Sequence, residues 1–180
     1  MLMWPGGNIT GLSIFTPELA AKRLELLKEA FPALTKAAVL LNPDNAIVLQ
    51  TFEARRSSDF ERVFTAMADQ QVDALVVIED TMLNANANAL AVFAAVKRLP
   101  SCGFPEFVRA GGLLAYGINF PDMDYRAATF VDKILKGAHP GDLPVEQSTK
   151  FNMMVNLQTA KALSITLPPT LLARADEVIE

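Results

Sequence analysis

The stretch Ala74-Leu75-Val76-Val77-Ile78-Glu79-Asp80-Thr81 joins an apolar run to two acidic residues and a threonine. A short, continuous apolar run is typical of a strand that is buried on both faces, as strands in parallel sheets are. The run Ala37–Leu41 repeats this pattern and is followed by Asn42-Pro43-Asp44-Asn45, a typical turn sequence. Two buried strands, each followed by a polar segment, predict an α/β fold with a parallel sheet.

The segments between these runs have helical patterns. A helix is predicted to begin at Thr16-Pro17-Glu18, since Thr16 can cap it and Pro17 suits its first turn. Its apolar residues recur at helical spacing, and its charged residues, Arg23 among them, are expected to face solvent. Three further helices are predicted, starting at Ser58 and spanning Asn86–Arg98 and Asp124–Lys136.

Strands and helices alternate up to about residue 117, which predicts a parallel sheet with helices on both faces. Beyond this point the order is helix, strand, helix, with too few strands for a second sheet. Apolar residues alternate with others in Phe151–Leu157, which predicts a half-buried strand. The segment after residue 117 is therefore expected to pack on something else.

Composition excludes several classes of function. The 180 residues carry a net charge of −4 without a basic stripe, so no nucleic-acid partner is predicted. A single cysteine, Cys102, excludes an internal disulfide and a cysteine zinc site, and the single histidine, His139, lies in a turn sequence and cannot serve both a metal and acid-base catalysis. A metalloenzyme and a Ser-His-Asp triad are therefore disfavoured, and we predict no catalytic residue, metal or cofactor. The segment Met1–Gly7 lacks the pattern of a secretion signal, so the chain as it stands is expected to be cytoplasmic.

Several segments, taken in order, resemble the substrate-binding proteins of ABC transporters, in the family associated with tryptophan- and tyrosine-type ligands. The resembling segments are Pro5–Ser13, Lys22–Glu29, Val39–Asn45, Glu106–Leu113, Ala127–Gly137, Asp142–Gln147, Asn156–Leu163 and Leu171–Asp176. The resemblance covers nearly the whole chain, and the ordered combination is more specific than any one motif.

The resemblance implies a type I periplasmic-binding fold, in which two α/β lobes close on a ligand. Residues 1–11 would be the first crossing between the lobes, and residues 12–117 a Rossmann-like, ligand-binding second lobe. Residues 118–180 would be a return segment that holds a helical and strand remnant of the other lobe. The implied function is a non-enzymatic, amino-acid-binding component of an uptake system, periplasmic or membrane-associated, with a membrane permease as its partner.

The same resemblance suggests which residues contact the ligand. Asp80 best matches the acidic residue that holds the amino group of an amino-acid ligand in the family, because a carboxylate and an ammonium group form strong charge-assisted hydrogen bonds. The alternative is a solvated acidic strand end, which this resemblance makes the less favoured of the two. The full set of expected ligand-binding residues is Asn8, Thr10, Asp80, Thr81, Tyr116 and Asn119.

Two features depart from the family pattern. The resemblance begins at a lobe crossing, so most of the first lobe is expected to be missing and the chain could be unable to bind a ligand. In addition, Asn42–Ala46 is too short to connect two parallel strands if Ile47–Glu53 is the second. That strand is thus expected to form a hairpin or to leave the sheet, exposing one sheet face, and the exposed surface predicts a homodimer or a swapped oligomer.

Two other functions remain open at this point. The chain could be a sensory ligand-binding domain of a regulator, which would share the fold. It could also be a flavodoxin-like Mg²⁺-dependent enzyme or phosphoacceptor, because Glu79 and Asp80 could bind a divalent cation together with Asp44. Genomic neighbours would separate transport from sensing.

Overall fold

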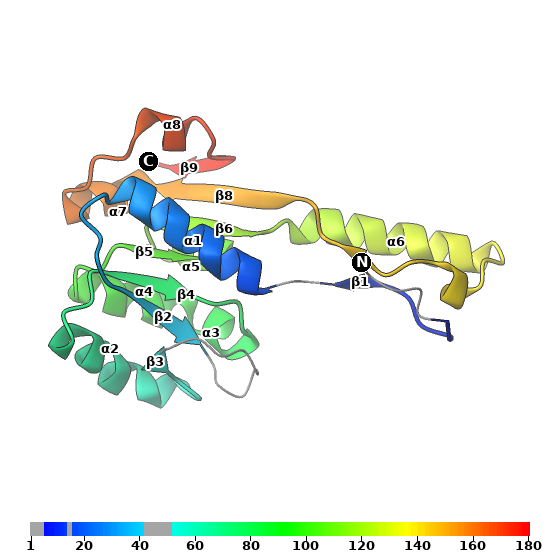
Figure 1. The fold of residues 1–180 in the computed structure, drawn as a ribbon, viewed down its shortest axis with the longest axis horizontal. Coiled ribbons are helices and arrows are strands. Elements are labelled where there is room, and N and C mark those ends of the chain that lie inside the picture. The colour runs from blue at the N-terminus through cyan, green and yellow to red at the C-terminus, as the bar shows by residue number, and fades with distance from the viewer. Residues whose placement is uncertain (1–5, 14–15, 42–51) are drawn as a thin grey trace. The chain divides into compact units, whose positions relative to one another are not determined.

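We describe the protein from a computed structural model, in which residues 6–13, 16–41 and 52–180 are described. Its main feature is a seven-stranded sheet with the strand order β3-β2-β4-β5-β6-β8-β9 (Figure 1). The strands of this sheet are β2 (Ala37–Leu41), β3 (Phe52–Glu53), β4 (Ala74–Val77), β5 (Ser101–Gly103), β6 (Leu114–Ile118), β8 (Phe151–Asn156) and β9 (Glu177–Ile179).

The first five strands in this order pair in parallel, and so do β8 and β9. Strand β8 runs antiparallel to β6, since the amide of Asn156 donates to the carbonyl of Leu113 and that of Asn119 to the carbonyl of Lys150. Strand β4 is buried throughout, as a strand with helices on both faces must be. The predicted α/β class with a mostly parallel sheet is confirmed.

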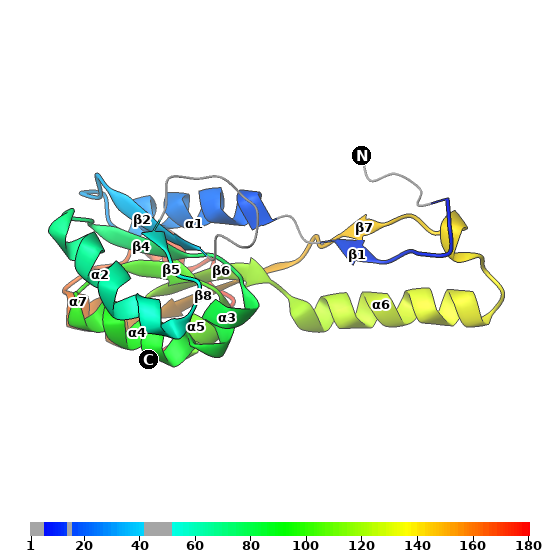
Figure 2. The same ribbon diagram turned by 90° about the horizontal axis from the view of Figure 1, so that it is seen from below.

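Helices cover both faces of this sheet (Figure 2). Leu26 and Leu27 of α1 pack in one apolar cluster, whereas Phe64 of α2 and Leu90 of α4 pack in another on the opposite face. The helices that pack with the sheet are α1 (Thr16–Ala30), α2 (Phe60–Asp69), α3 (Thr81–Ala85), α4 (Ala87–Val96), α5 (Pro105–Arg109), α7 (Leu157–Leu163) and α8 (Pro169–Leu172), with one 3₁₀ turn at Ser57–Asp59.

The expectations for the connection after β2 were wrong where the structure tests them. Strand β3 pairs in parallel with β2, with Phe52 opposite Leu40, so it neither forms a hairpin nor leaves the sheet. The described strand spans Phe52–Glu53, and residues 42–51, which include the predicted five-residue connection, lie outside the described residues. Most of the predicted strand, residues 47–51, lies outside the described residues. We also expected one face of the sheet to be exposed, but helices cover both faces.

Strand β8 differs from its prediction as well. Met153, Met154, Val155 and Asn156 are consecutive and all buried, so the strand is covered on both faces and not on one. Its position between β6 and β9 explains this burial, because an inner strand of the sheet lies under helices on either side.

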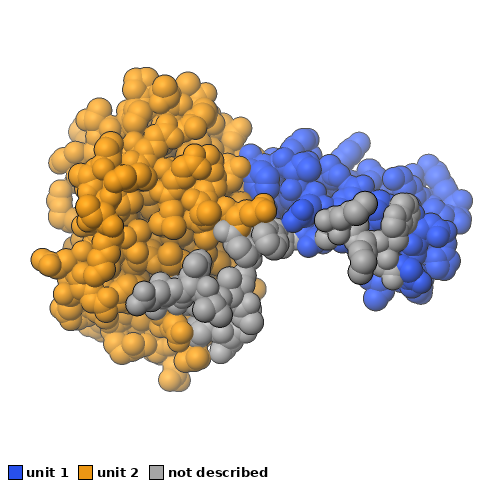
Figure 3. Space-filling view, viewed as in Figure 1, with its two compact units in different colours: residues 1–15, 118–151 blue, residues 16–117, 152–180 orange. Residues whose placement is uncertain are grey.

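The chain divides into two compact units (Figure 3). Unit 1 comprises residues 1–15 and 118–151, and unit 2 comprises residues 16–117 and 152–180. One segment of unit 2 ends at Gly117. Residues 152–180, expected in the return segment, pack with unit 2, because β8 and β9 extend its sheet.

Unit 1 contains a two-stranded parallel pair and one long helix. Its elements are β1 (Leu12–Ser13), α6 (Phe120–Leu135), a 3₁₀ turn at Pro140–Asp142 and β7 (Glu146–Gln147). Helix α6 leaves large apolar side chains exposed, with Leu135 at 82% and Tyr125 at 74% of their full accessibility. No helix within the described part of the chain is long and apolar enough to span a membrane.

Candidate functional site

The candidate site lies in unit 2, at the edge where the parallel strands end. Residues 78–80 follow β4, Phe104 follows β5, and Tyr116 and Gly117 lie in the last part of β6. Neighbouring parallel strands bring their carboxyl ends to the same edge, and ligands of open α/β sheets bind there. The polar residues after β4 are thereby placed beside the end of β6.

Asp80 caps the short helix that follows β4. Its Oδ1 accepts hydrogen bonds from the backbone amides of Met82, at 2.8 Å, and Leu83, at 3.2 Å. These amides have no partner within the helix, so an aspartate at this position stabilises the helix start. Thr81 is the first residue of α3 and is exposed. Both residues predicted from the sequence therefore lie at the expected edge, with Asp80 engaged in capping.

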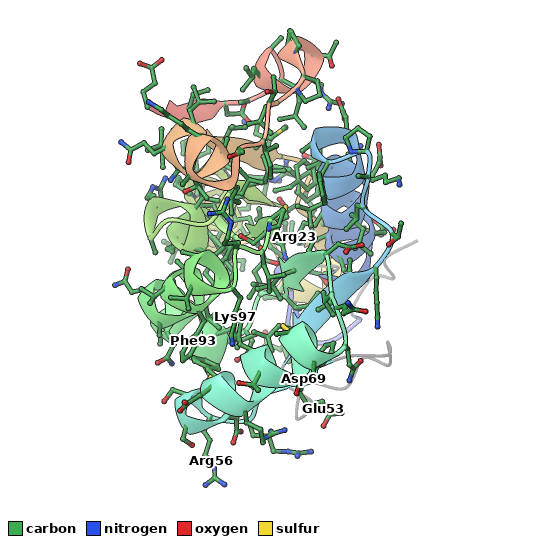
Figure 4. The ribbon with its side chains drawn as sticks, turned by 90° about the vertical axis from the view of Figure 1, so that its left-hand side faces the viewer. Arg23, Glu53, Arg56, Asp69, Phe93 and Lys97 are labelled. Carbon is green, nitrogen blue, oxygen red and sulfur yellow. The ribbon has the colours of Figure 1, made fainter. Side chains whose placement is uncertain are left out.

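Arg23 of α1 is the main feature of this site that sequence reasoning missed. Its guanidinium is fully buried in the interior of unit 2 (Figure 4) and makes three hydrogen bonds. It donates to the carbonyl of Val77 at 2.9 Å, to the carbonyl of Tyr116 at 2.8 Å and to Glu79 Oε1 at 2.6 Å. Arg23 thus binds the ends of β4 and β6 to α1.

The sequence predicted that Arg23 faces solvent, and this prediction is wrong. Leu19, Ala20, Leu26, Leu27 and Ala30 are all buried, and Arg23 occupies the middle of the face that they form. Positions three and four apart lie on the same side of a helix, so this spacing was the signal in the sequence. A charge on a buried face requires a buried partner, which Glu79 provides.

Glu79 has one occupied and one unoccupied carboxylate oxygen. Its side chain is 13% exposed, and Oε1 accepts from Arg23. Oε2 is buried and has no hydrogen-bond partner within the described structure. Gly117 faces the same carboxylate: a Cβ atom there would lie 3.0 Å from Glu79 Oε1 and 3.2 Å from Pro105 Cδ. A side chain at 117 would therefore crowd the carboxylate oxygen that accepts from Arg23, while Oε2 is an acceptor without a partner among the described residues.

The other predicted residues have mixed outcomes. Tyr116 is half-buried at the strand end, and its carbonyl is held by Arg23. Asn119 lies in unit 1, where its side chain caps α6 by accepting from the amide of Asp122 at 2.9 Å. Thr10, also in unit 1, donates to the carbonyl of Leu143 at 2.9 Å, and Asn8 is exposed. Asp80, Thr81 and Tyr116 therefore lie in unit 2, at the ends of β4 and β6, and the other three residues lie in unit 1.

Three other features of the described residues bear on alternative sites. They contain no group of three or more histidine, cysteine, aspartate or glutamate side chains that could hold a metal ion. Asp44, the third carboxylate of the Mg²⁺ hypothesis, lies outside the described residues. A hollow of about 340 Å³ lies between α4 and α7, and one of about 680 Å³ lies beside α2 and β3. Neither is lined by Glu79, Asp80 or Tyr116.

Comparison with known proteins agrees with this architecture. The sequence model of the ABC transporter substrate binding protein family matches residues 2–179. The chain belongs to this family. A curated relative, the tyrosine-binding protein of Clostridioides difficile (strain R20291), is 24% identical, and the match covers 89% of this chain and 51% of that protein.

Two solved structures share the fold of this family member. A conserved domain protein of Vibrio cholerae is 26% identical with a TM-score of 0.85, and the match covers 99% of this chain and 65% of that one. An ABC domain of Streptococcus pneumoniae in complex with L-Trp is 25% identical with a TM-score of 0.82, and the match covers 97% of this chain and 66% of that one. This family member therefore spans about half to two thirds of the length of these relatives.

Proposed function

We propose that the chain binds an amino acid or a similar small molecule at the carboxyl edge of the unit 2 sheet, as the solute-binding component of an ABC-type uptake system. The observation that carries this proposal is the set of polar residues at this edge, with Glu79, Asp80 and Thr81 directly after β4 and Tyr116 in the last part of β6. Relatives named for tyrosine binding and solved with L-Trp support an aromatic amino acid as the ligand.

The proposed partner is the membrane permease of the transport system, and the proposed location is on the outer side of the cytoplasmic membrane. Membership of the substrate-binding family supports both. We propose no catalytic step, because the function needs only selective, reversible binding. Of the six residues expected from sequence, the proposal uses Asp80, Thr81 and Tyr116. Thr10 and Asn119 instead make local hydrogen bonds within unit 1.

A thermal-shift screen of the 180-residue chain against the twenty amino acids tests this function. A ligand that binds only the folded chain raises its melting temperature, and the rise grows with ligand concentration. At a hundredfold excess over Kd, the free energy of unfolding increases by about 2.7 kcal/mol. We expect such a rise with L-tryptophan or L-tyrosine. Asp80→Asn, which keeps a capping oxygen, should reduce the ligand-induced shift.

Asp69→Asn is the matched control, because Asp69 is an exposed acidic residue at the C-terminal end of α2. It should leave the ligand-induced shift unchanged. The absence of a shift with any amino acid would contradict the proposed function and agree with the sequence-based expectation of a chain that does not bind.

A further inference from the structure

We propose that the hollow between α4 and α7 is a second binding site, which takes a compact apolar molecule with one carboxylate group. The hollow measures about 340 Å³, near the lower end of the roughly 300–1,000 Å³ that small-molecule pockets have. Ser101, the first residue of β5, lines it, so it lies at the sheet edge opposite to the proposed amino-acid site. The inference therefore does not depend on the proposed function.

The first argument is the buried hydroxyl group of Ser101. This residue is only 1% exposed, and its Oγ accepts a hydrogen bond from the amide of Leu113 at 3.4 Å. No hydrogen bond among the described residues gives the hydroxyl proton of Ser101 an acceptor. Because buried polar groups in native proteins nearly always have partners, this proton indicates an acceptor from outside the chain, in the hollow that Ser101 lines.

The second argument is the charge of Arg98, which alone among the described residues lining the hollow is ionised. Its Nη2 donates to the carbonyl of Ala162 at 3.3 Å, so the guanidinium reaches α7 from the end of α4. Arg109 and Arg174 pair with glutamates, whereas the described part of the chain provides Arg98 with no carboxylate. A guanidinium has five N–H donors in a planar fork that fits a carboxylate. Arg98 therefore has donors available for an anionic ligand.

The third argument is the chemistry of the walls. Ala94, Leu99 and Leu163 line the hollow with apolar side chains, which suit an apolar ligand body. No carboxylate among the described residues lines it, so the ammonium group of an amino acid would have no anionic partner there. The predicted ligand class is therefore a small apolar monocarboxylate, and a zwitterionic amino acid is disfavoured.

Titration of the ¹⁵N-labelled, 180-residue chain with benzoate and with its neutral analogue, benzamide, tests this site. Benzoate should shift the amide resonances of Leu99, Ser101 and Thr159 in a saturable manner and leave those of residues 78–81 unchanged. Because hydrogen bonds between charged groups are stronger than neutral ones, benzoate should bind at least about fivefold more tightly than benzamide. The absence of shifts around the hollow at millimolar benzoate would mean that it holds water only, and would overturn the proposal.

Arg98→Gln tests the charged contact. Glutamine suits the backbone there, because Gln71 has the same φ of 52° as Arg98. The preference for benzoate should fall to within about twofold, while the affinity for benzamide stays near that of wild type. Lys97→Gln is the matched control, since Lys97 is an exposed cation that does not line the hollow, and it should keep the preference. A preference that survives Arg98→Gln, or that Lys97→Gln also abolishes, would overturn the role of Arg98.

Ala162→Leu tests the location of the ligand. Ala162 lines the hollow on α7 and is exposed, so a leucine there should fill part of the hollow without disturbing the core. The shifts with benzoate and benzamide should both be lost, whereas any response of residues 78–81 to L-tryptophan should remain. Benzoate binding that Ala162→Leu leaves unchanged would place the ligand outside the hollow and overturn the proposal.

Discussion

Arg23 Nε lies 2.8 Å from the carbonyl oxygen of Tyr116, 93 residues further along the chain. The same guanidinium binds the carbonyl of Val77, so one side chain of α1 holds the ends of both β4 and β6. Backbone carbonyls at a strand end have no further ladder partner, and a fully buried cation supplies one. The geometry of the candidate site therefore depends on a residue that belongs to none of its loops.

Replacing Arg23 by methionine should destabilise the fold strongly. The change leaves Glu79 as a buried, unpaired carboxylate, and breaking a buried pair in this way costs about 3 kcal/mol or more. Urea unfolding followed by circular dichroism measures this cost. Lys22→Ala, a change of a partly exposed neighbour on the same helix, should stay within about 0.5 kcal/mol of wild type.

The double variant Arg23→Met/Glu79→Gln separates the charge effect from the loss of packing. It should be more stable than Arg23→Met alone, because no unpaired charge remains buried. A double variant that is less stable than the single one would show that the unpaired carboxylate is not the source of the cost.

The sequence predicted strands best where apolar residues form an uninterrupted run. The apolar runs Ala37–Leu41 and Ala74–Ile78 predicted two inner strands, which β2 and β4 confirm. Strand β8 was harder to predict, since Asn156 is polar yet buried, where it caps α7 by accepting from the amide of Thr159. The burial of β8 depends on its position between β6 and β9, and the local sequence pattern does not predict that position.

The site was predictable only in part for the same reason. An acidic pair after a buried strand indicated the carboxyl edge of the sheet, since parallel strands all end there. The division of roles between Glu79 and Asp80 depends on Arg23, which is 56 residues away from Glu79 in sequence. Contacts between distant segments are determined by tertiary packing. The only sign of this contact in the sequence is a charged residue, Arg23, on the apolar face of a helix.

Asp73 should make the free energy of unfolding depend on pH in the acidic range. Its Oδ2 accepts from the hydroxyl of Thr35 at 2.7 Å and from the amides of Thr35 and Lys36 at 2.9 Å. These hydrogen bonds, that of the hydroxyl first, lower the pKa of Asp73 below its ordinary value of 3.8. A lowered pKa means that the stabilisation is present above the ordinary value and is lost as pH falls through the folded-state value.

The corresponding test compares wild type with Asp73→Asn in urea. Wild type should be the more stable at about pH 7, and the difference should shrink as pH is lowered through about 3.8 and below. A stability difference that stays constant over this range would contradict the role of the Asp73 carboxylate.

Cys102 should be inert in the folded protein. The thiol lies in β5 in the core, and burial raises its pKa to about 12. The thiolate is the reactive form, and burial both disfavours the thiolate and blocks access by a reagent. The thiol should therefore react with a disulfide reagent only after unfolding in guanidinium. Rapid reaction of the native chain would contradict the burial of β5.

The exposed face of α6 should cause the chain to associate. Phe120, Val131 and Leu135 recur at helical spacing and are all exposed, and an exposed apolar stripe of this kind favours an interface. We expect a dimer by light scattering at micromolar concentration and a monomer for Val131→Lys/Leu135→Lys. The matched control Val92→Lys/Val96→Lys changes two exposed valines of α4 and should remain dimeric. A monomeric mass for the wild-type chain would contradict this prediction.

The most direct test of ligand binding at the carboxyl edge of unit 2 is a map of amide chemical shifts in the ¹⁵N-labelled chain during titration with L-tryptophan. The largest shifts are expected for residues 78–81 and 116–117, with smaller ones for Arg23. A concentration of the shifts around Leu99, Ser101 and Thr159, which line the hollow between α4 and α7, would place the ligand elsewhere. That result, or no shift at saturating L-tryptophan and L-tyrosine, would contradict the proposed site.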